Sequence, residues 1–203
     1  MRLGIMGGTF DPIHFGHLVT AEEALVQFNL DRVLFMPTGH PALKSDQRVT
    51  PAEDRYLMTV IATAATPDFD VSRLEVDRPG LTYTVDTLVA LRDEYGPAAE
   101  LFFITGADAI WDIVGWKDAE QIAGLATFIA ATRPGYDLAA ARGAHEEQVT
   151  RFRIELIEVP ALAISSTDLR ARLAERRAIR YLTPEAVGSY IEKRGLYREA
   201  GRA

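Results

Sequence analysis

The sequence predicts an α/β fold: a doubly wound parallel sheet with helices on both faces and a C-terminal helical segment. Apolar runs of strand length alternate with longer helix-like segments, which is typical of a parallel sheet. A glycine-rich turn leads from the first run into a helical segment, and doubly wound sheets bind phosphate groups at such turns. The runs cover residues 3–6, 33–36, 101–104, 127–131 and 154–159.

Helix signals occupy the segments between these runs. The first helix is predicted over residues 16–28 and the third over about residues 85–94. Between them, residues 50–53 read Thr-Pro-Ala-Glu, the pattern of a capping box with proline at the first helical position. This pattern predicts a second helix that extends towards residue 65.

The end of the chain predicts a pair of helices. Ser165 or Ser166 can cap a helix that runs through residue 173. Residues 183–185, Thr-Pro-Glu, begin another helix, and Gly195 ends it. These two helices form the predicted C-terminal helical segment.

Composition narrows the class of protein. The 203 residues are 48% hydrophobic and 25% charged, which fits one domain over residues 1–203. The formal net charge of −7 disfavours broad binding to nucleic acid or to acidic membranes. The chain has no cysteine, which excludes thiolate metal sites, cysteine nucleophiles and disulfides. Without a signal peptide or spanning segment, we expect a cytoplasmic protein.

The turn after the first run reads GGTFDPIHFGH over residues 7–17. Gly7 and Gly8 let the backbone approach a ligand, while His14 and His17 place two imidazoles at a helix start. An isolated glycine pair would more often be a tight turn with two solvated histidines. A metal site would need further ligands, and the segment offers only Asp11. We therefore favour phosphate binding.

The full eleven-residue string resembles the signature of the nucleotidyltransferase superfamily, which carries a His-x-Gly-His element on a Rossmann-like fold. Further segments, in the same order, resemble bacterial nicotinate-mononucleotide adenylyltransferases over nearly the whole chain. The resemblance implies transfer of the AMP moiety of ATP to nicotinate mononucleotide in NAD biosynthesis, with Mg²⁺ held mainly by the ATP phosphates. These segments are RYLM (55–58), TYTVDTL (82–88), GADA (106–109), WK (116–117), RPGY (133–136) and ISSTDLR (164–170).

The resemblance also implies roles for individual residues. It implies four catalytic residues, which hold and neutralise the reacting phosphates: His14, His17, Lys44 and Arg170. It implies an ATP site with both histidine-motif and C-terminal residues: Gly7, Gly8, Thr9, Phe10, His17, Gly106, Asp108, Arg133, Ile164, Ser165, Ser166, Thr167 and Arg170. It implies a substrate site that consists of Thr84, Trp116 and Lys117.

Several of these roles have a physical basis and a plainer alternative. Ser165 to Thr167 offer hydroxyls and free N–H groups at a helix N-terminus, with Arg170 about one turn further, but they could be an ordinary helix cap. Asp108, after a strand, could accept hydrogen bonds from ribose hydroxyls or cap a helix. Arg133, which the resemblance places beside adenine, would otherwise pass as a surface arginine.

The substrate residues also have two interpretations. Trp116 follows Gly115 in an irregular stretch, where an indole face can stack on a pyridine ring, although tryptophan is more often a core residue. The resemblance implies that backbone N–H groups of Thr84 and Lys117 hold the pyridine carboxylate. Residues 82–84 could otherwise be ordinary strand chemistry.

One loop departs from the family pattern. Many relatives have Pro-Pro-His-Lys after the second strand, whereas residues 41–44 read Pro-Ala-Leu-Lys. Lys44 remains, the loop histidine is absent, and His40 cannot be assumed to replace it. We expect residues 37–49 to form a functional loop.

Two competing functions stay open. Phosphopantetheine adenylyltransferase has a similar first motif, but its chain is typically shorter and lacks the Thr-Tyr-Thr and Trp-Lys segments. A nucleotide-binding regulator without turnover would also fit the fold, because fold does not dictate function. Intact His14, His17 and Lys44 argue against a regulator. A homo-oligomer is compatible with the sequence.

Overall fold

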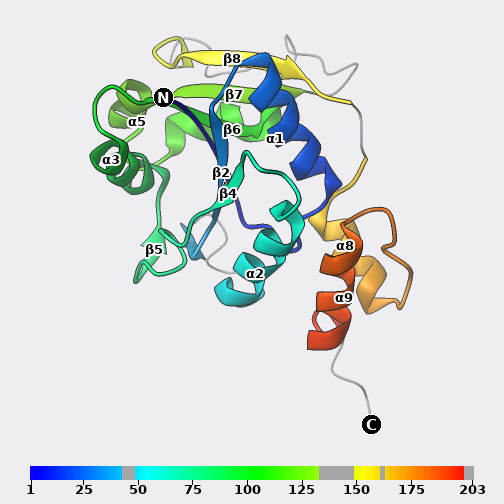
Figure 1. Ribbon diagram of the computed structural model, residues 1–203. Helices are drawn as coiled ribbons and strands as arrows, with labels where there is room; N and C mark the ends of the chain where they lie inside the picture. Colours follow the sequence, from blue (N-terminus) through cyan, green and yellow to red (C-terminus); the bar gives the residue numbers. More distant parts are fainter. Residues whose placement is uncertain (43–48, 133–148, 161–162, 199–203) are drawn as a thin grey trace.

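The computed structural model describes residues 1–42, 49–132, 149–160 and 163–198. Its centre is a six-stranded sheet in which every neighbouring pair is parallel, in the order β4-β2-β1-β6-β7-β8 (Figure 1). The chain therefore winds outwards from β1 in one direction and then returns to β6 to wind in the other. The strands are β1 (Arg2–Gly8), β2 (Arg32–Pro37), β4 (Phe69–Val71), β6 (Glu100–Gly106), β7 (Thr127–Thr132) and β8 (Ile154–Glu158).

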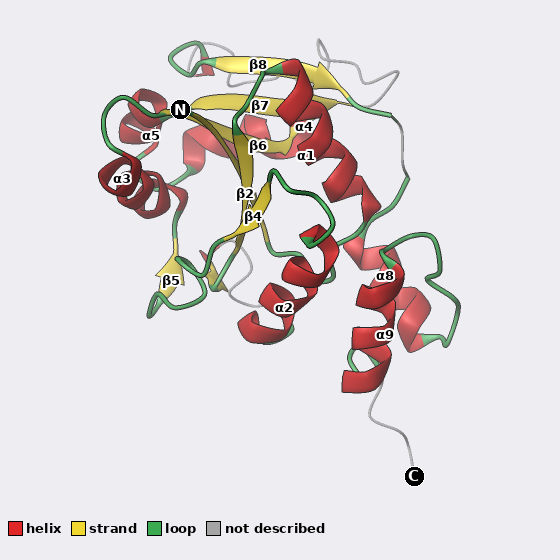
Figure 2. Ribbon diagram, in the orientation of Figure 1, coloured by secondary structure: helices red, strands yellow, loops and turns green. Residues whose placement is uncertain are grey.

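Helices cover both faces of this sheet (Figure 2). One face packs against α1 (Phe15–Gln27), α2 (Ala52–Thr63), α8 (Ser166–Ala174) and α9 (Glu185–Arg194), and the other against α3 (Thr84–Tyr95), α4 (Ala107–Ile110) and α5 (Ala119–Leu125). Alternate residues of β1 divide between the two cores, with Ile5 on the α3 side and Met6 on the α1 side. The predicted fold class is thus confirmed.

The strand order reverses between β1 and β6, so the loops that follow these two strands lie side by side at the carboxyl ends of the central strands. Met6 lies opposite Ile104, so the ends of β1 and β6, Gly8 and Gly106, emerge close together. In doubly wound sheets, ligands bind in the crevice at this switch point. A two-stranded sheet of β3 (His40–Pro41) and β5 (Leu81–Thr82) lies near the same ends of the strands, because β3 closely follows β2.

The predicted capping box at residues 50–53 is wrong in detail. Helix α2 begins at Ala52 and its N-cap is Pro51, with no side-chain cap bond. Thr50 instead donates its backbone N–H to Asp11 Oδ2 at 3.2 Å. Tertiary contacts therefore displace the local cap. The terminal helix pair does form as predicted, with Ser165 capping α8 and Gly195 ending α9.

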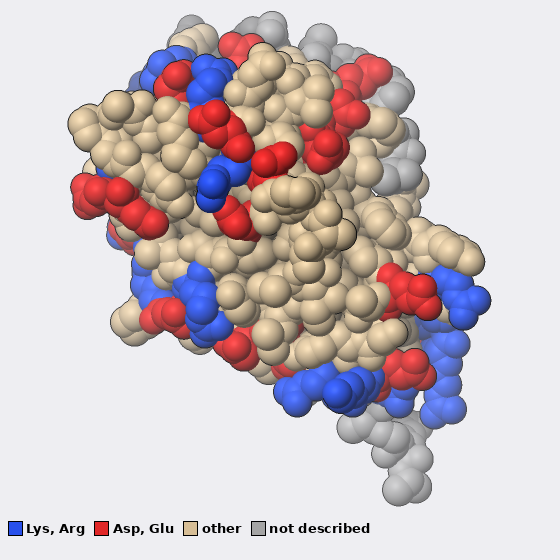
Figure 3. Space-filling view, in the orientation of Figure 1, with Lys and Arg blue, Asp and Glu red and all other residues tan. Residues whose placement is uncertain are grey.

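Helix α9 packs beside α2, and α8 lies next to α9 (Figure 1). Asp54 of α2 accepts hydrogen bonds from Tyr190 Oη at 2.7 Å and Arg194 Nε at 3.1 Å. Acidic and basic side chains are interspersed on the face in Figure 3, and basic side chains gather near the C-terminus. Within the described ranges, no helix is long and apolar enough to cross a membrane.

Candidate active site

The glycine turn after β1 is packed too tightly for side chains. A Cβ on Gly7 would lie 2.7 Å from the ring of Phe103, and one on Gly8 would lie 2.7 Å from the ring of Phe10. Phe10 itself adopts a left-handed backbone conformation, with φ of 49°, which is uncommon for a non-glycine residue. Its buried ring packs edge-on against His17, with ring centroids 5.0 Å apart. Phe10 therefore supports a histidine of the motif.

The two motif histidines lie against each other at the start of α1. His14 is the N-cap, and its ring stacks on that of His17 with centroids 3.8 Å apart and planes 25° apart. The backbone N–H of His14 donates to His17 Nδ1 at 3.2 Å. In neutral His17 the ring proton is therefore on Nε2, which makes that atom a hydrogen-bond donor.

His14 is suited to act as a neutral group. Its side chain is buried, and burial lowers the pKa of His14 to about 4, so the imidazole is uncharged at pH 7. Its Nδ1 atom is buried and has no hydrogen-bond partner in the part of the chain that the structure describes. Buried polar atoms in folded proteins are nearly always paired, so this atom fits a contact with a ligand.

The C-terminal serine–threonine motif joins the histidine motif directly. Ser166 Oγ donates to the carbonyl oxygen of Pro12 at 2.8 Å, and Arg170 Nη1 donates to that of Asp11 at 2.7 Å. Arg170 Nη2 also donates to Thr167 Oγ1 at 3.3 Å. These bonds hold the N-terminus of α8 beside the start of α1, although the bonded residues lie 154 and 159 positions apart in sequence.

The side chains of Ser165 and Ser166 both make hydrogen bonds within the protein. Ser165 Oγ accepts from the backbone N–H of Asp168 at 3.1 Å and so caps α8, while Ser166 contacts Pro12. The N–H groups of Ser166 and Thr167 remain at the open end of the helix, where they can face an anion. The carbonyl oxygen of Ile164 lies 3.8 Å from the position of a Cβ on Gly16, so this residue also reaches the histidine motif.

A second group of predicted residues meets where α3 begins. Thr84 is the first residue of α3, so its backbone N–H is among those that lack a helical partner. Lys117 lies over the ring of Tyr83, with its Nζ atom 4.6 Å from the ring centroid. The same Nζ atom lies 3.5 Å from Asp86 Oδ1. Half-buried Trp116 packs edge-on against Phe103 at 6.0 Å. The structure thus brings the Thr84 and Trp116–Lys117 segments together.

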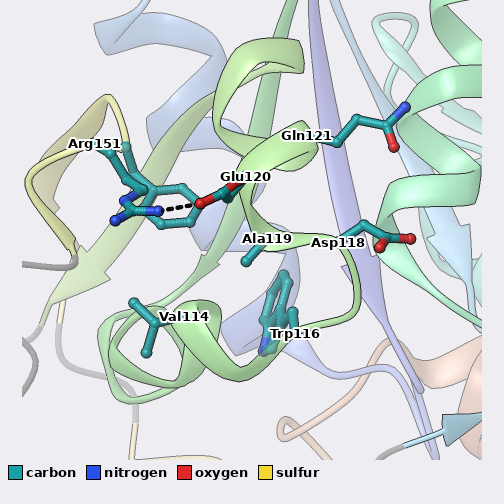
Figure 4. Close-up of a pocket in the computed structure, with 8 residues that line it drawn as sticks. Val114, Trp116, Asp118, Ala119, Glu120, Gln121 and Arg151 are labelled. Atoms are coloured by element: carbon teal, nitrogen blue, oxygen red, sulfur yellow. Dashed lines mark hydrogen bonds and ion pairs between the residues drawn. The ribbon is translucent and has the colours of Figure 1, made fainter.

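A cavity of about 680 Å³ lies beside Trp116 (Figure 4). In Figure 4 the ion pair between Arg151 Nη1 and Glu120 Oε1, 2.8 Å long, lies on one side of the view, Asp118 and Gln121 lie on the other, and the indole of Trp116 lies between them. Neither His14 nor His17 lines this cavity, so it is separate from the histidine motif. Its walls are Val114, Trp116, Asp118, Ala119, Glu120, Gln121, Arg151 and Phe152.

Three predicted site residues are not placed in full. Lys44 and Arg133 lie outside the described residues, and for Asp108 the backbone, in α4, is described without the side chain. Gly106 is exposed at the end of β6, with open space where a Cβ would lie. Thr9 accepts a hydrogen bond through its backbone carbonyl and supports the turn.

Sequence reasoning missed the buried guanidinium of Arg55 as a site component. Its Nη1 donates to the carbonyl of Thr9 at 2.7 Å, Nη2 to that of Gly39 at 2.8 Å, and Nε to that of Thr50 at 2.8 Å. Burial lowers the pKa of Arg55, while the neighbouring Asp11 carboxylate opposes that change. Arg55 thus joins the glycine turn at residues 7–9 to both ends of the 37–49 loop. Its signal was present in segment 55–58, but no local pattern marks an arginine as buried.

Asp11 is a second missed residue. Its Oδ1 accepts from Tyr197 Oη at 2.6 Å and its Oδ2 from the Thr50 N–H, while its carbonyl accepts from Arg170. Burial and the Asp11 carboxylate raise the pKa of Tyr197, so this hydroxyl stays protonated and donates. The C-terminal segment therefore supports the histidine motif. Among the described residues, no three His, Asp or Glu side chains cluster closely enough to hold a metal ion.

Comparisons with known proteins identify the family of the chain. Residues 5–172 match the cytidylyltransferase-like family. The chain is 57% identical to a probable nicotinate-nucleotide adenylyltransferase of Moorella thermoacetica, over 97% of this chain and 92% of that protein. It is 54% identical to one of Corynebacterium glutamicum, over 98% and 90% of the two chains.

Solved structures share the fold. A Plasmodium falciparum nicotinic acid mononucleotide adenylyltransferase complexed with NaAD aligns with a TM-score of 0.76 at 24% identity, over 97% of each chain. At that identity the likeness supports the fold, and the identities above 50% establish the family. The chain therefore belongs to the cytidylyltransferase-like family and, within it, to the nicotinate-nucleotide adenylyltransferases.

Proposed function

We propose that this chain transfers the AMP moiety of ATP to nicotinate mononucleotide, giving nicotinate adenine dinucleotide and pyrophosphate in NAD biosynthesis. One observation carries the proposal: Arg170 and Ser166 bond to Asp11 and Pro12, which joins two phosphate-binding motifs into one surface. Relatives that match over nine-tenths or more of their length have names for this activity.

The chemistry is a single displacement. An oxygen of the mononucleotide 5′-phosphate attacks the α-phosphorus of ATP; a new P–O bond forms as the bond to pyrophosphate breaks. Because both reactants are anionic, catalysis depends on in-line positioning and on charge stabilisation by fixed donors. His17 Nε2–H, the Arg170 guanidinium and the first N–H groups of α8 supply such donors, and we assign Lys44 the same role.

The proposal also covers the metal. Since the described residues form no cage of carboxylates or histidines, Mg²⁺ is best held by the ATP phosphates themselves. Mg²⁺ held by the phosphates would supply charge neutralisation for the pyrophosphate leaving group. The protein contributes neutral and cationic donors, which do not compete with the phosphates for Mg²⁺.

We assign recognition of the pyridine base to the residues at the start of α3 and at positions 116–117. The indole of Trp116 supplies a flat face for the pyridine ring, and the N–H groups of Thr84 and Lys117 suit its carboxylate. The helix dipole of α3 adds positive potential at Thr84. We further propose a cytoplasmic, single-domain protein that uses these small molecules.

Pyrophosphate release by the purified protein tests the function against its alternatives. We expect release when ATP, Mg²⁺ and nicotinate mononucleotide are all present, and none when one is omitted. Turnover with phosphopantetheine instead of the mononucleotide would assign the chain to the other adenylyltransferase. Binding of ATP without turnover on either acceptor would indicate the regulator.

A further inference from the structure

Glu75 is a buried carboxylate between β4 and β5 to which the reaction assigns no role. Its Oε1 accepts a hydrogen bond from Thr87 Oγ1 at 2.6 Å. Arg78 Nη1 donates to the same hydroxyl at 3.0 Å, and Nη2 donates to the carbonyl of Asp86 at 3.3 Å. Glu75 and Arg78 together therefore fix the first turn of α3, which begins at Thr84.

The backbone of Glu75 contacts the segment that follows β2, next to the glycine turn. A Cβ on Gly39 would lie only 2.1 Å from the Glu75 carbonyl oxygen, so the two backbones are in close contact. The neighbouring Thr38 hydroxyl is near enough to the Glu75 carboxyl group to help lower its pKa. Thr38 also donates to the Gly8 carbonyl, from its N–H at 2.9 Å and from its hydroxyl at 3.2 Å. Glu75 thus lies between the glycine turn and the start of α3.

Glu75 has two protonation states that offer different groups to its neighbours. The ionised carboxylate can only accept hydrogen bonds, as it does from Thr87, whereas the neutral carboxyl group also has one proton to donate.

The surroundings put these two states near neutral pH. Burial raises the pKa of Glu75 to about 7, against the opposing effects of Thr87, Arg78, Arg55 and Thr38. Arg78, from the same segment, and Arg55, from α2, are the charged groups that face it, and Thr38 and Thr87 contribute hydroxyls. Both states are populated between pH 6 and 8.

We propose that Glu75 is a positioning residue that couples the pyridine-binding turn at Thr84 to the glycine turn at Gly8, through its hydrogen bond to Thr87 and its backbone contact with Gly39, next to Thr38. The inference rests on the proposed function of these two turns. In the ionised state the bond from Thr87 is charge-assisted and holds α3 more firmly. Nicotinate mononucleotide therefore binds more tightly above pH 7 than below it.

Steady-state kinetics of Glu75→Gln between pH 6 and 8.5 test this coupling. The variant keeps the shape but stays neutral, so its KM for nicotinate mononucleotide should equal that of wild type at pH 6. At pH 8 it should exceed the wild-type KM by about tenfold, the size expected for one hydrogen bond to a charged group. Ionisation of the substrate cancels in this ratio, and kcat should change by less than about twofold.

Asp54→Asn is the matched control. Asp54 is an equally buried carboxylate with a hydroxyl and a guanidinium partner, but it joins α2 to α9. This variant should lower the melting temperature and leave the pH dependence of KM unchanged. If Glu75→Gln does not fold, Thr87→Val removes the same link from α3 and should show the same pH-dependent ratio.

Three results would overturn the inference. A KM ratio that stays constant from pH 6 to 8.5 in a folded variant would show that the charge of Glu75 is not coupled to the base site. The same pH-dependent ratio in Asp54→Asn would show a general effect of lost stability. Wild type that releases no pyrophosphate with ATP and nicotinate mononucleotide would refute the proposed function, and this inference with it.

Discussion

Arg170 donates a hydrogen bond to the carbonyl oxygen of Asp11 across 159 residues of sequence, at 2.7 Å. The bond fixes a cation beside the turn that precedes His14 and His17. It brings two motifs that are far apart in the sequence next to each other. We therefore expect that activity depends on the position of the Arg170 guanidinium as well as on its positive charge.

Arg170→Ala should lower kcat by about two orders of magnitude or more, because a fixed donor to the developing phosphate charge is lost. Arg170→Lys keeps the charge but cannot reach both Asp11 and Thr167, so it should restore little of the rate. Pyrophosphate release and circular dichroism should be measured together. Full activity in Arg170→Lys would mean that charge alone suffices.

Arg55→Met should destabilise the fold, because three backbone carbonyls, one of them fully buried, lose the donor that the buried guanidinium provides. We expect a loss of about 3 kcal/mol or more in the free energy of unfolding, measured by urea denaturation. Arg73→Met is the control: Arg73 pairs with Glu53 and Asp77 on the surface, and its loss should barely shift the denaturation midpoint. Similar shifts in both variants would argue against the special role of Arg55.

His14 should make stability depend on pH below neutrality. Its pKa is about 4 in the folded chain and 6.5 when unfolded, so the unfolded chain binds the extra proton between those values. Stability from this residue is complete above pH 6.5 and falls as pH decreases, by at most about 1.4 kcal/mol per pH unit. Relative to His14→Leu, wild type should lose stability from pH 7 to 5. A constant difference between the two would contradict the burial of a neutral imidazole.

Trp116→Ala should weaken binding of both nicotinate and nicotinamide mononucleotides, by about 1–3 kcal/mol if stacking resembles base–aromatic contacts elsewhere. Wild type should prefer the acid, because the amide turns an NH₂ donor towards an N–H group and leaves it unpaired. Calorimetry of each mononucleotide with both proteins separates these effects. Loss of the acid preference only in the variant would make Trp116 the discriminator.

The sequence predicted the sheet where strands are continuous apolar runs, as in residues 101–104, which have both faces buried. It did not reveal β4, because this strand is three residues long and contains Asp70, which pairs with exposed Arg32 at 2.6 Å. An edge strand of that kind has no hydrophobic run to detect. Its pairing with β2 depends on the completed fold.

The site residues also divide into those that a local sequence pattern predicts and those that depend on tertiary contacts. The histidine string and the serine cap are local patterns, so residues 7–17 and 165–170 could be read directly. Arg55 and Glu75 act on backbone and hydroxyl groups brought close by folding, and their roles cannot be read from neighbours in the sequence. The capping-box prediction at Thr50 was wrong for a related reason: Asp11 takes its N–H.

The path of phosphate oxygen tests the central claim most directly. Nicotinate mononucleotide with ¹⁸O in its 5′-phosphate should be incubated with the protein, ATP and Mg²⁺, and the products analysed by mass spectrometry. Attack by that phosphate on the α-phosphorus of ATP predicts that all label appears in nicotinate adenine dinucleotide and none in pyrophosphate. Label in pyrophosphate, or AMP formed without dinucleotide, would contradict the account.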